Sequence, residues 1–205
     1  MDSFTELAAH ILATAPRLGP VRLVAVDGPS GAGKSWFAGK LAAAAGMPLV
    51  HTDDLLDGWD DQFTFWERLE EQVLAPLRCG RTATYRRYQW DRGEFGGSRV
   101  TVGPAAAVLV EGVTSARRTV RPELSFSVFV TAPAELRWRR AVARDGGDDV
   151  AFRAYLERWR LAEEEHFAAE GTAGAVDLVV DGAAEVPGDR YVPLQEPLHW
   201  PRSAV

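Results

Sequence analysis

The sequence predicts an α/β fold in which a parallel β-sheet of about five strands is flanked by helices on both faces. Short apolar runs alternate with longer segments of helical character along the chain, as they do where helices connect parallel strands. The first apolar run leads directly into a glycine-rich loop and then into a helix. With 205 residues the chain has the length of one such domain, so we expect a single domain over residues 1–205.

The first half of the chain contains two predicted strands and three predicted helices. The run at 21–26 is mostly apolar, as buried parallel strands are, and a second short run follows at 49–51. Ser3 is a favourable N-cap, so residues 1–18 are expected to form an N-terminal helix and a linker. The predicted helices span residues 3–15, 33–45 and 62–79, the last with Phe65, Leu69, Val73 and Leu77 on one side.

The second half of the chain supplies three more predicted strands, at 105–110, 126–130 and 176–180. Before them, residues 84–103 form a small irregular excursion, which we expect to be a β-ribbon. Helices are predicted over 133–144 and 149–169, the first within a helical lid at about 133–147. Several prolines follow Glu185 and exclude regular structure there, so residues 186–205 are expected to be an irregular tail.

The glycine-rich loop at 28–35 is the most specific motif of the sequence. It fits the pattern Gly-x-x-x-x-Gly-Lys-Ser of a phosphate-binding loop, which makes the P-loop NTPase fold the expected form of the α/β fold. Its glycines let backbone N–H groups surround a polyphosphate, Lys34 reaches the β- and γ-phosphates, and Ser35 offers its hydroxyl to Mg²⁺. The residues predicted to bind nucleotide are Gly28, Ser30, Gly31, Ala32, Gly33, Lys34, Ser35 and Trp36.

Features elsewhere in the chain narrow the class of nucleotide-binding protein. The Asn-Lys-x-Asp element by which GTPases recognise guanine is absent, and the chain is short for a ring-forming ATPase with an extra helical domain. A kinase that phosphorylates a small acceptor is therefore favoured, with ATP as donor and Mg²⁺ as cofactor. An NTPase switch or assembly factor without a small-molecule acceptor is the alternative from a different class.

The segment 51–56, His-Thr-Asp-Asp-Leu-Leu, resembles the element that carries the base in the uridine kinase family, whose wider relatives include pantothenate kinase and phosphoribulokinase. The resemblance implies that Asp53 accepts the proton of the acceptor hydroxyl, with Asp54 as the weaker candidate. A carboxylate at the end of a strand beside the phosphate loop is suited to this role. The structural alternative is that the two aspartates only form a turn or cap a helix.

Further matches to the uridine kinase family follow in the same order as in that family. Tyr88-Gln89-Trp90 resembles its Tyr-Asp-Phe motif, which implies that Tyr88 and Trp90 line a nucleobase site. Glu111 stands at the end of an apolar strand and is followed by a glycine, as in the family. This match implies that Glu111 binds either Mg²⁺, together with Ser35, or the acceptor. Asp60 matches an aspartate that binds sugar hydroxyls, and Asp61 is the next candidate.

Three arginines of the predicted lid helix recur at helical spacing and so lie along one face: Arg137, Arg140 and Arg144. The pattern resembles the lid helix of the uridine kinase family. The resemblance implies that Arg140 and Arg144 act in catalysis with Lys34 and Asp53, and that Arg137 helps to bind substrate. A solvated basic face is the structural alternative.

The net charge of −6 argues against a general affinity for nucleic acid or for anionic membranes. Neither a membrane-spanning apolar run nor a basic leader is evident, so a cytoplasmic location is expected. A nucleoside is the best guess for the small-molecule acceptor, with another hydroxylated metabolite or a nucleoside monophosphate as alternatives. The sequence leaves open whether ATP or GTP is preferred and whether the chain forms a homo-oligomer.

Overall fold

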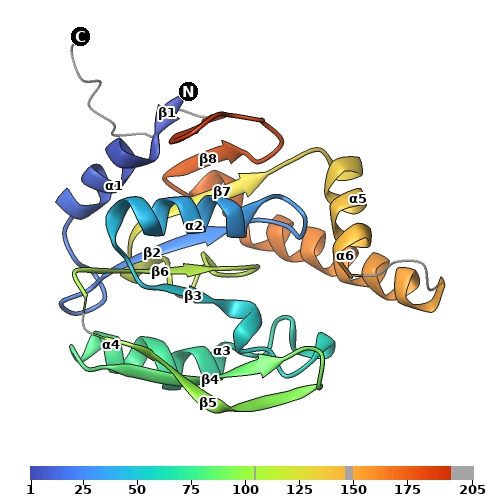
Figure 1. Cartoon of the computed structure of the whole chain (residues 1–205), viewed down its shortest axis with the longest axis horizontal. Helices are drawn as coiled ribbons and strands as arrows, with labels where there is room; N and C mark the ends of the chain where they lie inside the picture. The colour runs from blue at the N-terminus through green and yellow to red at the C-terminus, as the bar shows by residue number, and fades with distance from the viewer. Residues whose placement is uncertain (104, 146–149, 195–205) are drawn as a thin grey trace.

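A computed structural model describes residues 1–103, 105–145 and 150–194 of the chain. Five parallel strands form its central sheet in the order β3-β6-β2-β7-β8, which confirms the predicted α/β fold (Figure 1). The strands are β2 (Arg22–Asp27), β3 (Leu49–His51), β6 (Ala107–Glu111), β7 (Leu124–Thr131) and β8 (Leu178–Asp181).

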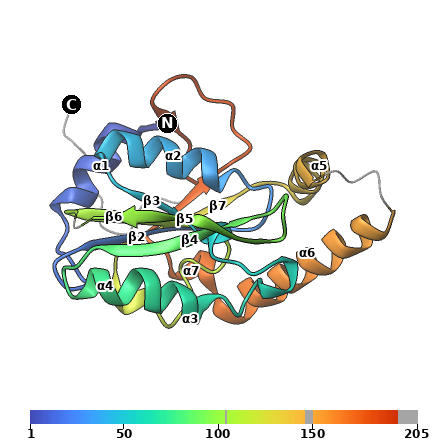
Figure 2. The ribbon, with the colours of Figure 1, turned by 60° about the horizontal axis from the view of Figure 1, so that its bottom comes forward.

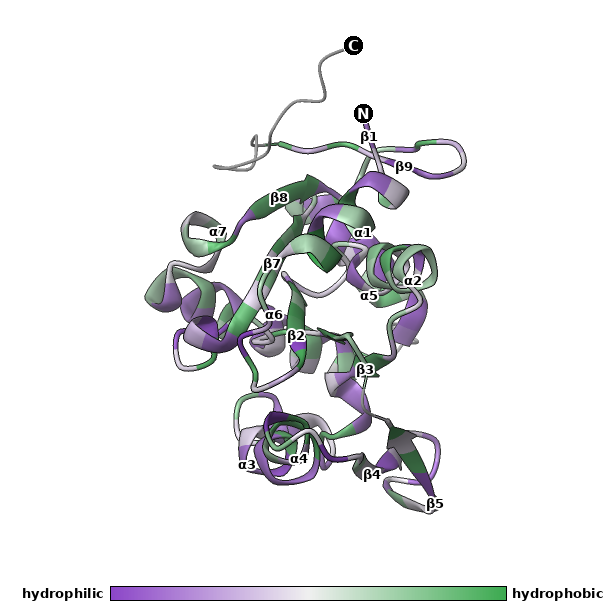
Figure 3. Cartoon of the chain, turned by 90° about the vertical axis from the view of Figure 1, so that its left-hand side faces the viewer, coloured by the Kyte–Doolittle hydropathy of each residue, from purple (hydrophilic) through white to green (hydrophobic). Residues whose placement is uncertain are grey.

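Helices cover both faces of this sheet because its strands are apolar on both sides. In β2, Val24 and Val26 point into one core cluster, whereas Leu23 and Ala25 point into the other. The first cluster is closed by α1 (Phe4–Ala13) and α2 (Lys34–Ala45), and the second by α3 (Trp66–Leu69) and α4 (Ala75–Arg78). Figure 2 shows the two helix pairs on opposite sides of the strands, and Figure 3 shows that β2, β7 and β8 are largely apolar.

The predicted helix 62–79 is present, but it begins later and is not uniform. It runs from α3 through a π-helical turn, Glu70–Leu74, into α4. The helix begins later because residues 57–64 form a turn around the Asp61 carboxylate. This carboxylate accepts hydrogen bonds from the Asp57 backbone N–H and from the Thr64 hydroxyl. The apolar side predicted for this helix is buried, with Phe65, Leu69, Val73 and Leu77 in the second core cluster.

The excursion after this helix is an antiparallel ribbon of β4 (Ala83–Gln89) and β5 (Glu94–Val102), as expected. The ribbon lies next to α3 and α4, beyond the β3 edge of the main sheet (Figure 1). The turn between its strands carries Trp90, which therefore sits at the tip of the ribbon.

Two helices lie beyond the carboxyl ends of the sheet strands, α5 (Ala134–Asp145) and α6 (Val150–Glu170) (Figure 1). They match the predicted helices, although residues 146 and 147 of the expected lid lie outside the described residues. A further short helix, α7 (Thr172–Ala175), leads into β8 and was not predicted. No helix within the described ranges is both long and apolar enough to cross a bilayer.

The expectation of an irregular tail over residues 186–205 is wrong at residues 190 and 191, whereas residues 186–189 are irregular. A short strand, β9 (Arg190–Tyr191), pairs antiparallel with β1 (Asp2–Ser3) at the other end of the chain. Burial explains this pairing, since the Tyr191 ring packs 5.2 Å from that of Phe4. The Asp189 carboxylate also accepts hydrogen bonds from Ser3 and Thr5. Residues 195–205 of the predicted tail lie outside the described part of the chain.

Candidate active site

At two positions of the loop between β2 and α2, the φ angle and the close neighbours together exclude every residue but glycine. Gly28 and Gly31 have φ angles of 138° and 75°, in the region that L side chains rarely adopt. A Cβ atom on Gly28 would lie 2.1 Å from the Val130 carbonyl oxygen, and one on Gly31 would lie 2.3 Å from that of Arg137. The glycines thus let the loop touch both β7 and α5.

A buried carboxylate that sequence analysis missed, Asp27, anchors the base of the loop. It accepts hydrogen bonds from the backbone N–H groups of Gly28 at 2.7 Å, Thr114 at 3.0 Å and Ala116 at 2.9 Å. Burial raises the pKa of Asp27 to about 6, although these donors and the charge of Lys34 oppose the shift. Asp27 therefore ties the phosphate loop to the segment that follows β6.

The two polar side chains that begin α2 have partners within the chain. The Lys34 ammonium donates to the Pro29 carbonyl oxygen at 3.1 Å, and the Ser35 hydroxyl donates to Glu111 Oε1 at 3.1 Å. Glu111 reaches Ser35 because β6 pairs with β2 in a register that sets Val26 opposite Glu111. The end of β6 and the phosphate loop thus share one polar cluster.

Glu111 is buried and only partly satisfied. Its Oε1 atom lies 2.6 Å from His51 Nδ1, whereas Oε2 has no hydrogen-bond partner in the described part of the chain. Burial opposes ionisation, but the hydrogen bond to His51 and the charge of Lys34 prevail, so the pKa of Glu111 lies below its usual value. The same hydrogen bond raises the pKa of His51. Glu111 is thus a carboxylate with one free oxygen.

These residues fit a magnesium ion held jointly with a nucleotide. Across the described ranges there is no cluster of three His, Cys, Asp or Glu side chains that could hold a metal. Mg²⁺ bound with nucleotides usually takes only one or two protein oxygens, and phosphates and water complete its shell. The free oxygen of Glu111 and the hydroxyl of Ser35 provide this donor set.

A cavity of about 380 Å³ opens beside the loop, and Asp53 lies in its wall with Lys34, Ser35 and Glu111. The Asp53 side chain is exposed to the solvent of this cavity, although neighbouring groups crowd around its carboxylate. Burial and the neighbouring Glu111 raise the pKa of Asp53, and Lys34 and Arg144 counteract them. The site therefore brings a carboxylate to the phosphate-binding groups.

The neighbouring Asp54 has a different environment. Its carboxylate lies 3.0 Å from the Arg87 guanidinium and 3.4 Å from the Tyr85 hydroxyl, both on the β-ribbon. Asp54 is not among the residues that line the cavity. The structure thus separates the two aspartates that the sequence left as alternatives: Asp53 faces the cavity and Asp54 anchors the ribbon.

The far wall of the cavity is aromatic and apolar. Trp90 lies there and donates from Nε1 to the Asp53 carbonyl oxygen at 3.2 Å, and the Trp59 ring meets it edge-on at 4.9 Å. Tyr88 is buried behind Trp90, with the two ring centroids 5.1 Å apart, and does not line the cavity. The other large apolar side chains of the lining are Leu56, Val113, Trp138, Leu156 and Trp159.

Three further sequence candidates also lie apart from the cavity lining. Asp60 accepts a hydrogen bond from the Tyr155 hydroxyl at 3.0 Å, which links it to α6. The alternative, Asp61, pairs with Arg68 at 2.8 Å. Trp36 lies on α2 with its side chain half exposed, and its ring meets that of Phe4 edge-on at 5.9 Å.

The predicted lid arginines occupy three different environments. Arg137 and Arg144 line the cavity, Arg137 donating to the Ala132 carbonyl oxygen at 3.0 Å. Arg144 pairs with Asp145 at 2.7 Å, and this hydrogen bond raises the pKa of Arg144. Arg140 instead links the phosphate loop to the residue that follows β8. It donates to the carbonyl oxygens of Gly31 in the loop at 3.3 Å and of Gly182 at 2.9 Å.

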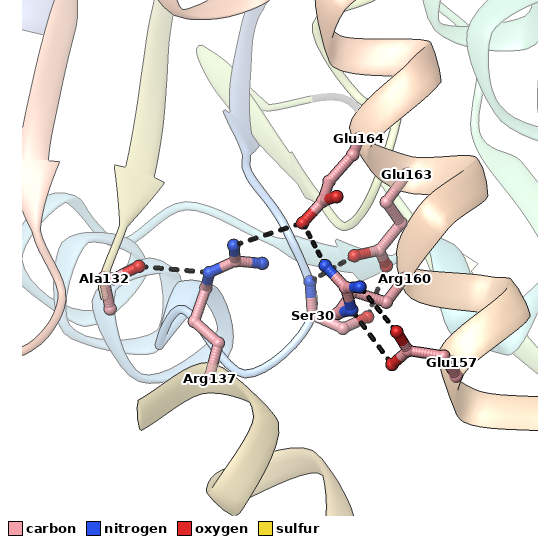
Figure 4. A network of polar contacts seen from close by, with 7 residues as sticks. All are labelled: Ser30, Ala132, Arg137, Glu157, Arg160, Glu163 and Glu164. Carbon is pink, nitrogen blue, oxygen red and sulfur yellow. Dashed lines mark hydrogen bonds and ion pairs between the residues drawn. The ribbon is translucent and has the colours of Figure 1, made fainter. Parts of the chain in front are cut away.

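Helix α6 supplies four cavity residues that the sequence did not assign to the site: Leu156, Trp159, Arg160 and Glu163. Figure 4 shows Glu163 pointing at Ser30 of the phosphate loop, and Arg160 between Glu157 and Glu164. Trp159 and Glu163 stand four residues apart, so a shared helix face was visible in the sequence. The sequence gives no sign that this face meets the loop.

Searches against family models and curated proteins find no match. Among solved structures, a possible uridine kinase from Bacillus stearothermophilus is 21% identical, with 86% of this chain and 96% of that one covered and a TM-score of 0.60. A putative fructose transport system kinase from Silicibacter sp. TM1040 is 21% identical, with coverage of 92% and 98% and a TM-score of 0.59. D-glycerate 3-kinase from Cryptococcus neoformans is 13% identical, with coverage of 92% and 98% and a TM-score of 0.52. The chain therefore has the fold of P-loop kinases.

Proposed function

We propose that this protein is an ATP-dependent kinase that transfers the γ-phosphoryl group to a hydroxyl of a small molecule. One observation carries the proposal: the Asp53 carboxylate lines the same cavity of about 380 Å³ as Lys34 and Ser35 of the phosphate loop. A phosphate loop alone accounts for nucleotide binding. A carboxylate in the same cavity adds the base that transfer to an acceptor hydroxyl requires.

The donor would be bound by the loop and by arginines of α5. Backbone N–H groups of residues 28–35 and the Lys34 ammonium are suited to the β- and γ-phosphates. Arg144 and Arg137 line the cavity from α5, and their charges would stabilise the negative charge of the transferring group. Arg140 would support the same site indirectly, because it donates to the Gly31 carbonyl oxygen.

Mg²⁺ would be held by the Ser35 hydroxyl and Glu111, whose Oε2 atom is buried and without a partner among the described residues. When bound, the ion neutralises charge on the phosphates. His51 holds Glu111 Oε1 at 2.6 Å, which fixes the carboxylate at the end of β6. Glu111 is thereby oriented before any ligand enters.

Asp53 would accept the proton of the acceptor hydroxyl. As that oxygen bonds to the γ-phosphorus, the bond between this phosphorus and the bridging oxygen breaks, and ADP leaves with the electron pair. The raised pKa of Asp53 makes it a stronger base than an ordinary aspartate. The charges of Lys34 and Arg144 limit this rise in pKa.

A nucleoside is the acceptor we favour, because the wall opposite the loop is aromatic. Trp59, Trp90 and Trp159 line it, and such side chains can stack on a nucleobase while Asp53 meets a sugar hydroxyl. The structural neighbours include proteins described as kinases of uridine, of a fructose system and of glycerate, so another hydroxylated metabolite is the alternative. A nucleoside monophosphate is the third acceptor class.

An acceptor panel tests the proposal. ADP release is measured with MgATP alone and with nucleosides, nucleoside monophosphates, sugars and hydroxy acids, and the products are weighed by mass spectrometry. A kinase gives low basal hydrolysis and a large increase with one acceptor class, whose product gains one phosphoryl group. Strong turnover without any acceptor, unchanged across the panel, would instead support an NTPase switch or assembly factor.

A further inference from the structure

A buried acid of α6 accepts hydrogen bonds from both donors of Ser30, a residue of the phosphate loop. Glu163 is 1% exposed, and its Oε2 atom accepts from the Ser30 backbone N–H at 2.9 Å. Its Oε1 atom accepts from the Ser30 hydroxyl at 2.5 Å and from Trp159 Nε1 at 2.8 Å. Both oxygens of this carboxylate are therefore engaged by neutral donors, and two of these belong to the loop.

This carboxylate stands where a triphosphate is expected to bind. Ser30, Lys34 and Glu163 line one cavity, so the negative charge of Glu163 faces the same space as the ammonium of Lys34. A triphosphate that takes the loop donors would meet this charge at short range in a partly desolvated site. Like charges placed together in such a site are mutually destabilising.

The arginines next to Glu163 are also paired with acids of the same helix (Figure 4). Arg160 lies 2.6 Å from Glu157 and 2.6 Å from Glu164, and the second of these acids also lies 3.9 Å from Arg137. Arg137 and Arg160 line the cavity, so entering phosphates could take both cations from these carboxylates. The α6 acids thus act as internal partners for groups suited to anions.

We propose that Glu163 is a positioning residue that holds the Ser30 donors of the phosphate loop in the nucleotide-free chain and is displaced when a triphosphate binds. The inference rests on the nucleotide binding of the proposed function. Trp159 would move with Glu163, because the Trp159 Nε1 atom donates to Glu163. The Trp159 ring belongs to the aromatic wall of the cavity, where the acceptor is proposed to bind. Donor binding would therefore reshape the acceptor side of the cavity.

A charge-neutral variant of the same shape tests the competition. Binding of MgATP is measured by calorimetry for the wild-type chain, for Glu163→Gln and for Glu165→Gln. Glu165 is the matched control, because it is an exposed acid of the same helix. Removing the competing charge should tighten MgATP binding by about tenfold in Glu163→Gln, with little change in Glu165→Gln. Unchanged or weaker binding in Glu163→Gln would overturn the proposal, because a carboxylate that merely supports the loop gives that result.

Hydrogen exchange of the wild-type chain provides a second test that needs no substitution. Backbone amides of α6 around residues 157–166 are followed with and without saturating MgATP, and with tripolyphosphate as a probe that lacks the nucleoside. Displacement of Glu163 predicts faster exchange there with either ligand. Slower or unchanged exchange would overturn the inference, and this measurement decides if the variant does not fold. A wild-type chain that binds no MgATP would contradict the proposed function itself.

Discussion

The Thr52 hydroxyl occupies the space that a side chain on Gly112 would need. A Cβ atom built on Gly112 would lie only 1.7 Å from Thr52 Oγ1, and Gly112 has a φ angle of 141°. The contact joins the segment after β3 to the segment after β6. Asp53 and Glu111, the neighbours of these two residues, both line the cavity, because the pairing of β3 with β6 sets them close together.

The first prediction concerns this contact. Gly112→Ala should lower the free energy of unfolding by about 2–4 kcal/mol, because alanine is strained at this φ and clashes with Thr52. Adding Thr52→Ala should recover part of the loss by removing the nearest atom, although the backbone strain remains. Urea unfolding of the single and double variants measures both effects. Gly112→Ala with wild-type stability would show that the segment has room that the structure does not show.

Glu111 is expected to set the magnesium requirement. Glu111→Gln removes the charge of the free oxygen but keeps the shape, so the Mg²⁺ concentration for half-maximal turnover should rise by about tenfold or more. Activity is titrated with Mg²⁺ at saturating ATP. Glu123→Gln, on an acid that pairs with Arg78 far from the cavity, is the control and should leave the titration unchanged. An unchanged requirement in Glu111→Gln would remove Glu111 from the metal site.

Trp90 should contribute to acceptor binding. Trp90→Ala removes a ring of the cavity wall and should raise the acceptor KM by about 5–150-fold, the range of base–aromatic stacking. The KM for ATP should change little. Trp36→Ala is a matched control on a half-exposed tryptophan outside the cavity, and it also tests the sequence-based assignment of Trp36 to the nucleotide site. An acceptor KM that responds to Trp36→Ala and not to Trp90→Ala would contradict the proposed acceptor wall.

The pH profile should report the environment of Asp53. Burial and Glu111 raise the pKa of Asp53 above its ordinary 3.8, and a base must be deprotonated, so kcat/KM should fall with acidification at a pH above 3.8. Arg144 lowers the pKa of Asp53, so Arg144→Gln should move this acidic limb to higher pH, whatever its effect on the maximal rate. Profiles at saturating Mg²⁺ for both proteins measure the shift. A limb that moves to lower pH in Arg144→Gln would contradict the assignment.

The parts of the fold that depend on local chemistry could be predicted from the sequence. The phosphate loop could be recognised because its backbone requires glycine. The strands of the sheet could be recognised because a buried parallel strand is apolar on both faces. Asp53 and Glu111 were found at strand ends. Their closeness to each other follows from the sheet order, in which β6 lies between β2 and β3.

The features that the sequence did not indicate depend on contacts between distant segments. Glu163 meets Ser30 across 133 residues of sequence, and no local pattern distinguishes it from the other acids of α6. Likewise β9 pairs with β1 at the opposite terminus. Tyr88 and Trp90 belong to one sequence motif, but Tyr88 is buried behind Trp90. Their positions depend on how the β-ribbon packs against the rest of the chain, which the motif does not indicate.

The most direct test of the proposed phosphoryl transfer is a single-turnover measurement on Asp53→Asn with the best acceptor of the panel. Loss of the base should slow transfer by about 10²–10⁴-fold, while ATP affinity stays within about twofold. Asp54→Asn, whose carboxylate instead pairs with Arg87, should retain most of the transfer rate. Transfer by Asp53→Asn at the wild-type rate, or a loss of ATP affinity that accounts for the whole defect, would contradict the role of Asp53 as the base.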